Sequence, residues 1–424
     1  PQKNCGTFGL GMNGSASVQV LPILQSHNRK PRFMSQVKPL QSIALPSTTR
    51  ADVRAQLLSS IQKVSGVITE HNSAAEAQRT LAPAVVAAMN EAGLFAMKSP
   101  REVGGAEIHP IDQIAVVEAV VKLDSAAAWT MFISATVTGR ALSAISDKAV
   151  DELMTLPDFP IMAGSLKPSG SAIEVEGGFR VSGQWAWGSG VGHADYVIVP
   201  VLRSDQTGLI TAVVPQSQVR VIDNWHALGI NGSGSSDYAL DDVFVPEHFA
   251  ITKPGQRRGG ALFRMGYGFA ANEHAIFALA LAQLMLDSFI RSAQKKRGYG
   301  KGASIADREI VQRAVAETEL RLRGTKLLMT DVLERLFAAS ADQEAPIALQ
   351  AEARAASVLC TDEAIAVTNT LFRYAGGSAV MLDDPMQRIL RDLYTAQSHL
   401  MVSDAAYEAL GKLRLGLTDN APLR

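Results

Sequence analysis

The chain has 424 residues, of which 47% are hydrophobic and 19% charged, a composition typical of a globular protein with two or three packed units. Its 40 basic and 41 acidic residues leave a formal net charge of −1, which excludes the basic footprint of a protein that binds nucleic acid or an anionic membrane. Only Cys5 and Cys360 are present, so a disulfide framework and a thiolate zinc site are excluded, and no metal site is predicted. We expect a cytoplasmic protein, since no uninterrupted apolar run reaches the roughly 18 to 20 residues that span a bilayer.

The first two regions of the chain differ in their periodicity. Residues 1–48 are rich in Gly, Ser, Pro and Gln without a sustained period, and we predict a disordered or extension tail. Residues 49–157 are rich in alanine and carry apolar residues at helical spacing, for example Val53, Leu57 and Ile61. We therefore expect four or five helices in an N-terminal helical domain.

After residue 157 the apolar residues recur every second position, as in a strand, and later they return to helical spacing. Residues 158–250 contain short alternating segments separated by turn residues, with a hairpin signal at Gly177-Gly178, and they predict a compact β-barrel or sandwich. Residues 260–415 contain four long helical segments, which predict a four-helix bundle. The expected segments are 265–293, 304–340, 346–373 and 385–413.

One stretch near the middle combines large aromatics with glycines. Trp185 and Trp187 precede Gly188, Ser189 and Gly190 at what is predicted to be the corner between two strands. Two aromatics beside a backbone that a ligand can approach closely would suit a planar cofactor. The alternative is a β-corner whose tryptophans fill a core.

Several short motifs resemble, in their order and spacing, those of the acyl-CoA dehydrogenase superfamily along nearly all of residues 50–415. The resemblance implies an N-terminal α-helical domain, a central β-barrel and a C-terminal four-helix bundle. The matching motifs lie at residues 100–105, 185–190, 225–237, 242–246, 374–377 and 385–392.

The departures from the dehydrogenase pattern indicate a branch. Dehydrogenases of short acyl-CoA esters commonly carry a base glutamate shortly after the final Arg-Asp pair, whereas here Arg391-Asp392 is followed by no carboxylate until Asp404. A histidine in this segment, His399, together with Trp-x-x-x-Ser-Gly ending at Ser189-Gly190, resembles the flavin-dependent monooxygenases of this fold. The oxygenase component of 4-hydroxyphenylacetate hydroxylase and dibenzothiophene monooxygenase are examples. Because the base lies elsewhere in some dehydrogenases, an acyl-CoA dehydrogenase or oxidase stays an alternative.

The resemblance also implies a chemistry and a set of partners. A separate NAD(P)H-dependent reductase supplies reduced flavin (FADH2 or FMNH2), O2 adds at its C4a carbon, and the hydroperoxide delivers oxygen to a substrate. We rank a small neutral aromatic of the indole or phenol type first, and a sulfur- or nitrogen-oxidising monooxygenase remains an alternative. A homodimer or homotetramer is expected. A non-catalytic flavoprotein or scaffold is a further alternative.

Candidate catalytic residues are assigned by the same resemblance. Ser189 matches a serine that hydrogen-bonds near flavin N5, Ser165 matches a polar active-site position, and His399 is placed to contact the peroxide, the flavin edge or the substrate. His274 is expected to be a surface or structural histidine, and Trp129 stands where sulfur-oxidising relatives carry a histidine.

Two further sets complete the predicted site. The flavin-binding residues implied by the resemblance are Trp187, Ser189, Trp225, Ser233, Ser235, Gly376, Gly377 and either Lys296 or Arg297. The residues expected to line the substrate pocket are Trp129, Phe132, Ser165 and Trp225.

Overall fold

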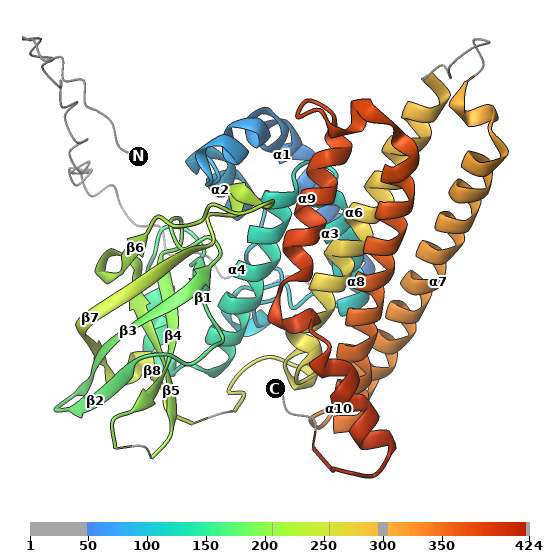
Figure 1. The fold of residues 1–424 in the computed structure, drawn as a ribbon. Helices are drawn as coiled ribbons and strands as arrows, with labels where there is room; N and C mark the ends of the chain where they lie inside the picture. The colour runs from blue at the N-terminus through green and yellow to red at the C-terminus, as the bar shows by residue number, and fades with distance from the viewer. Residues whose placement is uncertain (1–48, 206, 254, 296–303, 421–424) are drawn as a thin grey trace, which may run out of the picture. The chain divides into compact units, whose positions relative to one another are not determined.

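The computed structural model describes residues 49–205, 207–253, 255–295 and 304–420, drawn as ribbon in Figure 1. The predicted tail, residues 1–48, and the basic pair Lys296 and Arg297 lie outside the described residues. Along the described chain, a first group of helices is followed by strands and then by a second group of helices.

Five α-helices form between residues 49 and 157, as the helical period predicts. They are α1 (Arg50–Gln78), α2 (Pro83–Glu91), α3 (Pro110–Val121), α4 (Ser125–Ala144) and α5 (Asp147–Leu153). The predicted stripe of Val53, Leu57 and Ile61 is buried on α1. Asp124 starts α4, because its carboxylate accepts a hydrogen bond from the Ala127 amide at 2.6 Å.

The middle of the chain forms one sheet. Its strands are β1 (Met162–Gly164), β2 (Ser171–Val175), β3 (Gly178–Gly188), β4 (Tyr196–Arg203), β5 (Leu209–Pro215), β6 (Arg220–Ile222), β7 (Ser236–Pro246) and β8 (Ala250–Ile251). The strand order is β6-β7-β3-β2-β4-β5-β8, with β1 paired to β4. The predicted hairpin joins β2 to β3, and Gly177 takes a positive φ of 79° there.

The sheet is an open path and not the closed barrel that the sequence suggested. Its two edge strands, β6 and β8, have only three and two residues, too few to close the path through hydrogen bonds. Helices cover the inner face instead: Val137 and Leu142 of α4 share an apolar cluster with Val181, Trp185 and Tyr238 of the sheet. The overall class, helices then sheet then bundle, is the predicted one (Figure 1).

The last part is a helical bundle of α6 (Gly268–Lys295), α7 (Glu309–Ala339), α8 (Ile347–Ala375), α9 (Pro385–Gln397) and α10 (Ala405–Arg414). The prediction of one continuous helix over residues 385–413 is therefore wrong, because this segment forms two helices, α9 and α10. The break lies at His399, whose ring accepts a hydrogen bond from the Met401 amide at 3.2 Å and caps a short 3-10 turn over Leu400–Val402. A side chain that satisfies this amide competes with the continuing helix.

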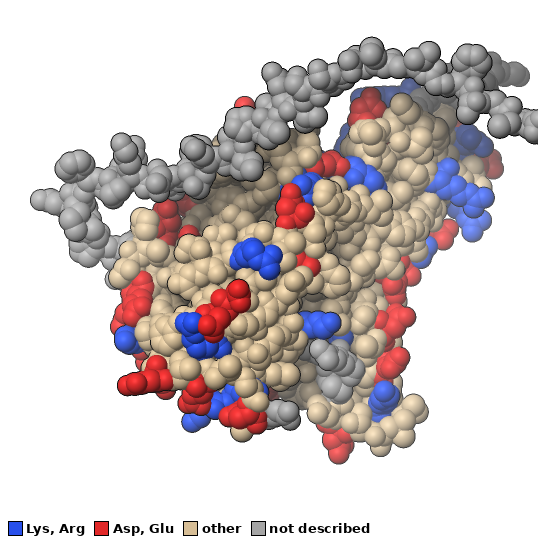
Figure 2. All heavy atoms as spheres, turned by 60° about the vertical axis from the view of Figure 1, so that its left-hand side comes forward, with Lys and Arg blue, Asp and Glu red and all other residues tan. Residues whose placement is uncertain are grey.

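Helix α6 is the central helix of the bundle. It is long and apolar enough to cross a membrane by length and composition, but 67% of its most apolar stretch is buried within the structure. It contacts α3, α7, α8 and α9. On the face of the protein in Figure 2, acidic and basic side chains are interspersed, as the near-zero net charge leads one to expect.

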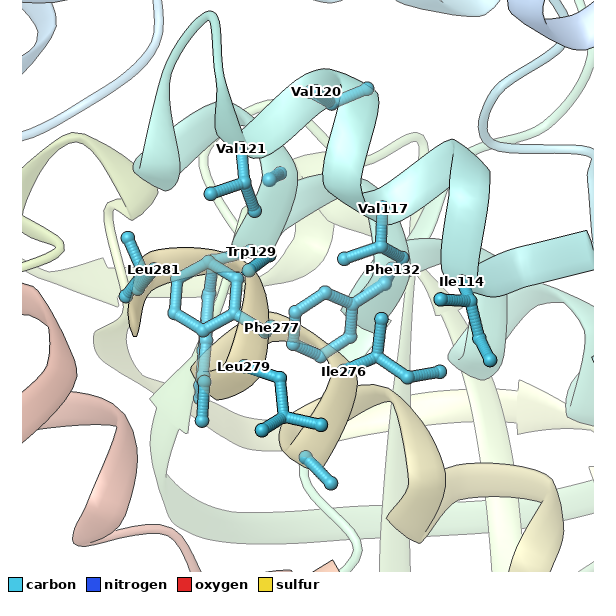
Figure 3. Packing of buried hydrophobic residues seen from close by; sticks show 14 of the residues in the cluster. Ile114, Val117, Val120, Val121, Trp129, Phe132, Ile276, Phe277, Leu279 and Leu281 are labelled. Carbon is cyan, nitrogen blue, oxygen red and sulfur yellow. The ribbon is translucent and has the colours of Figure 1, made fainter. Parts of the chain in front are cut away.

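Helix α4 connects the two large apolar cores. Its first half contributes Trp129 and Phe132 to the core shared with the bundle, and Figure 3 shows both beside Phe277 of α6. Its second half contributes Val137 and Leu142 to the core under the sheet. The described residues form one compact unit, so the division into 49–157, 158–250 and 260–415 stays a prediction from the sequence.

Candidate functional site

A chain of buried hydrogen bonds runs from α4 into the sheet. Trp129 Nε1 donates to Ser189 Oγ at 3.0 Å, and Ser189 Oγ lies 2.8 Å from Ser235 Oγ. Ser235 Oγ lies 2.7 Å from Ser233 Oγ, which donates to the Ile230 carbonyl at 2.8 Å. All four side chains are buried. The structure thus brings together four residues predicted separately, and we call them, with the Ile230 carbonyl, the hydroxyl chain.

The corner that carries Ser189 has a strained backbone. A β-bulge interrupts the pairing of β3 with β7 between Trp185 and Gly188, and Trp187 within it takes a φ of 62°. Positive φ is a genuine outlier for a bulky residue and marks a site where surrounding structure enforces it. The Trp187 side chain is 71% exposed. A flat apolar surface therefore stands next to a buried polar chain.

The same corner has hydrogen-bonding capacity that the described side chains do not use. The hydroxyls of Thr130 and Ser134 on α4 are buried without a hydrogen-bond partner among the described residues. An added Cβ at Gly190 would lie 3.1 Å from the Thr130 methyl carbon Cγ2 and 3.3 Å from the Ser134 hydroxyl oxygen, so the Ser134 hydroxyl is the one beside this glycine. Buried unpaired hydroxyls are rare enough to mark a candidate ligand site.

The loop before β7 is fixed to the bundle through Asp392. This buried carboxylate accepts hydrogen bonds from the Ile230 amide at 2.6 Å and from Ser125 Oγ. Burial raises the pKa of Asp392 to about 6, against the opposing effects of the Ser125 hydrogen bond and the Arg388 charge. Gly229 lies so close to α9 that an added Cβ would be 2.5 Å from its backbone. The peptide that precedes the Ile230 carbonyl is therefore held against the bundle.

Trp225 lies at the start of that loop. It is partly buried, and its Nε1 donates to the Ile230 carbonyl at 3.3 Å. Arg79 of α1 donates to the Trp225 carbonyl at 3.3 Å. Trp225 thus shares an acceptor with Ser233, which ties this predicted flavin-binding residue to the hydroxyl chain.

An aromatic cluster surrounds the Trp129 end of the chain. The Trp129 ring centroid lies 5.1 Å from Phe132, 5.3 Å from Phe277, 5.4 Å from His274 and 5.8 Å from His399, each in an edge arrangement. Phe132 has no exposed surface, so it supports Trp129 from inside the core, with Phe277 beside it in Figure 3. The cluster brings His399 next to the residue that holds Ser189.

His399 is a neutral imidazole in this environment. Its Nδ1 accepts from the Met401 amide, which assigns the ring proton to Nε2. Burial lowers the pKa of His399 to about 4. At neutral pH the ring therefore offers one N–H donor and no charge.

We expect His399 to make the stability of the fold depend on pH. Its pKa of about 4 lies below the ordinary value of 6.5, so the unfolded chain binds more protons between these values. The stabilisation is complete above pH 6.5 and is lost as the pH falls to 4. His399→Asn keeps a capping acceptor for Met401 but does not titrate. Between pH 7 and pH 5, the free energy of unfolding should fall by about 2 kcal/mol less in the variant than in the unsubstituted protein.

Urea titrations at the two pH values provide this measurement. His109 and His193, whose pKa burial also lowers to about 4, are present in both proteins, so the difference isolates His399. Equal losses in both proteins would show that the His399 ring titrates alike in the folded and unfolded states.

His274 lies against the candidate site. Of the two readings of this residue, surface or structural, the structure supports the second: His274 is buried and stacks on His399 with ring centroids 4.0 Å apart. Its Nδ1 lies 3.1 Å from the Ala270 carbonyl one turn earlier on α6. The available signal was a Glu-His pair, Glu273-His274, inside an otherwise apolar helix.

A buried ion pair lies next to His274. Lys98 Nζ lies 2.9 Å from Glu273 Oε1, and neither side chain has appreciable exposure. Thr136 of α4 bridges them, accepting from Lys98 at 3.0 Å and donating to Glu273 at 2.6 Å. Burial lowers the pKa of Lys98 and raises that of Glu273, while their mutual attraction opposes both shifts. The pair joins α6 to α4 beside the aromatic cluster.

Ser165 lies apart from the hydroxyl chain. Its amide donates to the Tyr238 hydroxyl at 2.8 Å, and its Oγ accepts from the Lys167 amide at 3.2 Å. The Ser165 hydroxyl therefore stabilises the turn that follows β1. Its predicted role in catalysis stays a prediction.

Gly376 and Gly377 lie at the end of α8. Both are exposed, and Gly376 takes a φ of 79° as the helix ends. An added Cβ on either glycine would meet no atom of the described residues within 4 Å. No described atom of this chain therefore packs against these two positions, and their contact with flavin stays a prediction.

Comparison with known proteins agrees with this architecture. The family model described as acyl-CoA dehydrogenase, N-terminal domain, matches residues 56–152, and that described as acyl-CoA dehydrogenase, C-terminal domain, matches residues 273–404. A pigment production hydroxylase from Rhodococcus sp. (strain ATCC 21145) is 25% identical over 384 residues, covering 87% of this chain and 99% of the relative. Indole-3-acetate monooxygenase from Pseudomonas putida is 25% identical over 345 residues, covering 80% and 88%.

Solved structures share the fold. XiaF from Streptomyces sp., in complex with FADH2 and glycerol, matches with a TM-score of 0.81 at 22% identity, covering 88% of this chain and 98% of that one. TdsC from Paenibacillus sp. A11-2, in complex with FMN and indole, matches with a TM-score of 0.75 at 16% identity, covering 87% and 98%. The two matched family domains flank the sheet in the predicted order, and the chain belongs to the acyl-CoA dehydrogenase superfamily.

Proposed function

We propose that this protein is the oxygenase component of a two-component flavin-dependent monooxygenase. It takes reduced flavin from a separate NAD(P)H-dependent reductase and uses O2 to hydroxylate a small neutral aromatic. The observation that carries the proposal is Ser189, a buried hydroxyl held by Trp129 and Ser235 two residues after the exposed, strained Trp187. Relatives named as flavin-dependent monooxygenase oxygenase subunits support it.

The residues of the corner fit a flavin. Trp187 offers an exposed aromatic face, Ser189 a hydroxyl, and Ser134 an unused hydroxyl beside Gly190. When bound, reduced flavin, as FADH2 or FMNH2, supplies the electrons that activate oxygen. The chain's part is to hold the flavin edge, to keep Ser189 near N5 and to exclude water.

The uncharged character of the site argues for a neutral substrate. Its polar groups are hydroxyls and the neutral His399, while the charges of Lys98, Glu273 and Asp392 are engaged in buried contacts of their own. Trp129 and Trp225 supply aromatic rings for contact with an aromatic substrate. We therefore propose an electron-rich neutral ring, indole before a phenol, with His399 Nε2 as a donor to substrate or oxygen. The TdsC complex with indole supports this order.

The dehydrogenase alternative has less support. Proton abstraction next to a thioester needs a free carboxylate. After Asp392 the first carboxylate in the sequence is Asp404, and Asp392 itself is committed to Ile230 and Ser125.

We further propose a cytoplasmic homodimer or homotetramer assembled through the bundle. Leu320 and Leu327 of α7 are 66% and 62% exposed, and a shallow groove between α7 and α8 lies nearby, lined by Thr325, Leu328 and Leu359 among others. Exposed apolar side chains on one helix favour contact with another chain.

The test supplies the protein with a flavin reductase, NADH and indole. The expected result is blue indigo, which forms from the 3-hydroxylated product. A parallel reaction without the protein controls for reductase alone, and one with a carboxylated phenol tests the substrate order. Turnover of the carboxylated phenol without any of indole would overturn the substrate proposal, and bleaching of bound oxidised flavin by an acyl-CoA would overturn the oxygenase proposal.

A further inference from the structure

We infer that the hydroxyl chain fixes Ser189 as a hydrogen-bond acceptor toward flavin, so that the protein selects reduced over oxidised flavin through Ser235 and Ser233. The inference rests on the proposed function, since it concerns flavin bound at this corner. It assigns positioning roles to two serines that do not themselves need to contact the reacting atoms.

The direction of every hydrogen bond in the chain is set by its carbonyl end. A carbonyl oxygen only accepts, so the single Ser233 hydroxyl proton goes to Ile230. Ser233 must then accept from Ser235, 2.7 Å away. The Ser235 proton is thereby used, and Ser235 in turn accepts the proton of Ser189 at 2.8 Å. The three serines therefore point their protons one way, toward Ile230.

The opposite end of the chain agrees with this direction. An indole N–H only donates, so Trp129 Nε1 donates to Ser189 Oγ at 3.0 Å. Ser189 thus gives its one proton to Ser235 and receives one from Trp129. One of its two lone pairs remains, and toward any further group Ser189 can only accept.

This property distinguishes the two redox states of a flavin. Reduced flavin carries a proton on N5, which an acceptor binds, whereas N5 of oxidised flavin is itself an acceptor and needs a donor. An acceptor-only hydroxyl facing N5 therefore favours the reduced form and places two acceptors against each other in the oxidised form. Leaving such groups unpaired in a buried site is costly.

The direction is stable because the Ile230 carbonyl cannot turn away. The Ser233 amide donates to this carbonyl at 3.1 Å and Trp225 Nε1 at 3.3 Å. The preceding peptide is held by the hydrogen bond from the Ile230 amide to Asp392. Ser233 and Ser235 are buried, which keeps both hydroxyls away from bulk water. Removing Ser235 would release the Ser189 proton, and Ser189 could then donate to oxidised N5.

The test measures dissociation constants of FMN and FAD, each oxidised and, under anaerobic conditions, reduced. In Ser235→Ala we expect the preference for reduced flavin to fall about tenfold, chiefly through tighter binding of the oxidised form. For a two-electron couple this lowers the midpoint potential of bound flavin by about 30 mV. Trp129→Phe removes the other partner of Ser189 but leaves its proton on Ser235, so the preference should be retained.

Ser236→Ala is the matched control. Ser236 follows Ser235 in the sequence and is also buried, but it is not part of the hydroxyl chain. It should bind both forms as the unsubstituted protein does. If Ser235→Ala keeps the full preference, or Trp129→Phe loses it equally, the inference is overturned while the oxygenase proposal stands. If the unsubstituted protein binds neither flavin, the proposed function is overturned and this inference with it.

Discussion

Lys98→Met is expected to lower the free energy of unfolding by about 3–5 kcal/mol, because it leaves the Glu273 carboxylate buried without its counter-charge. Lys98 and Glu273 are both fully buried, 2.9 Å apart, so neither charge can be solvated in place. Thr136 would still donate to Glu273, which limits the loss but does not neutralise the charge. Urea denaturation at pH 7 measures the effect.

Two further variants separate the charge effect from packing. Lys98→Met combined with Glu273→Leu removes both charges and should recover most of the lost stability, as replacement of buried pairs by apolar residues generally does. Lys326→Met breaks a surface ion pair between Lys326 and Glu118, in which the lysine side chain is 47% exposed. This variant should lower the free energy of unfolding by about 1 kcal/mol or less. A Lys98→Met loss no larger than that of Lys326→Met would contradict the assignment of a buried ion pair.

The order of the elements was predictable because each depends on local periodicity. The buried stripe of Val53, Leu57 and Ile61 and the Gly177-Gly178 hairpin depend only on residues near in sequence, and both are confirmed. The break of the last helix at His399 was not predictable, since it depends on one ring capping one amide. The open sheet was not predictable either, because closure depends on which edge strands meet and which helices cover them.

The site was predictable in its members and not in its connections. Ser189, Ser233, Ser235 and Trp129 were each named from the family motifs, but the bonds that order them join residues up to 60 positions apart. The Lys98 and Glu273 pair is also distant in sequence, and the polar Glu273-His274 step within an apolar helix does not indicate which residue pairs with Glu273. Long-range polar contacts of this kind are set by tertiary packing, which is why the family motifs did not reveal the proton direction of the hydroxyl chain.

Ser189→Ala is expected to uncouple flavin oxidation from hydroxylation while leaving the fold intact. The substitution removes the acceptor that faces N5, and one hydrogen bond is worth about 1 kcal/mol, or roughly a fivefold change in partitioning. Product per reduced flavin should fall by about that factor, and hydrogen peroxide released per reduced flavin should rise to match. Trp129 Nε1 loses its acceptor, so stability should fall by no more than about 1–2 kcal/mol.

Single turnovers with excess oxygen, with peroxide and hydroxylated product both quantified, measure the partitioning. Ser236→Ala, which leaves Ser189 and Ser235 in place, should keep the original ratio. An unchanged ratio in Ser189→Ala would remove this serine from the reaction and would leave His399 Nε2, a neutral donor beside Trp129, as the candidate.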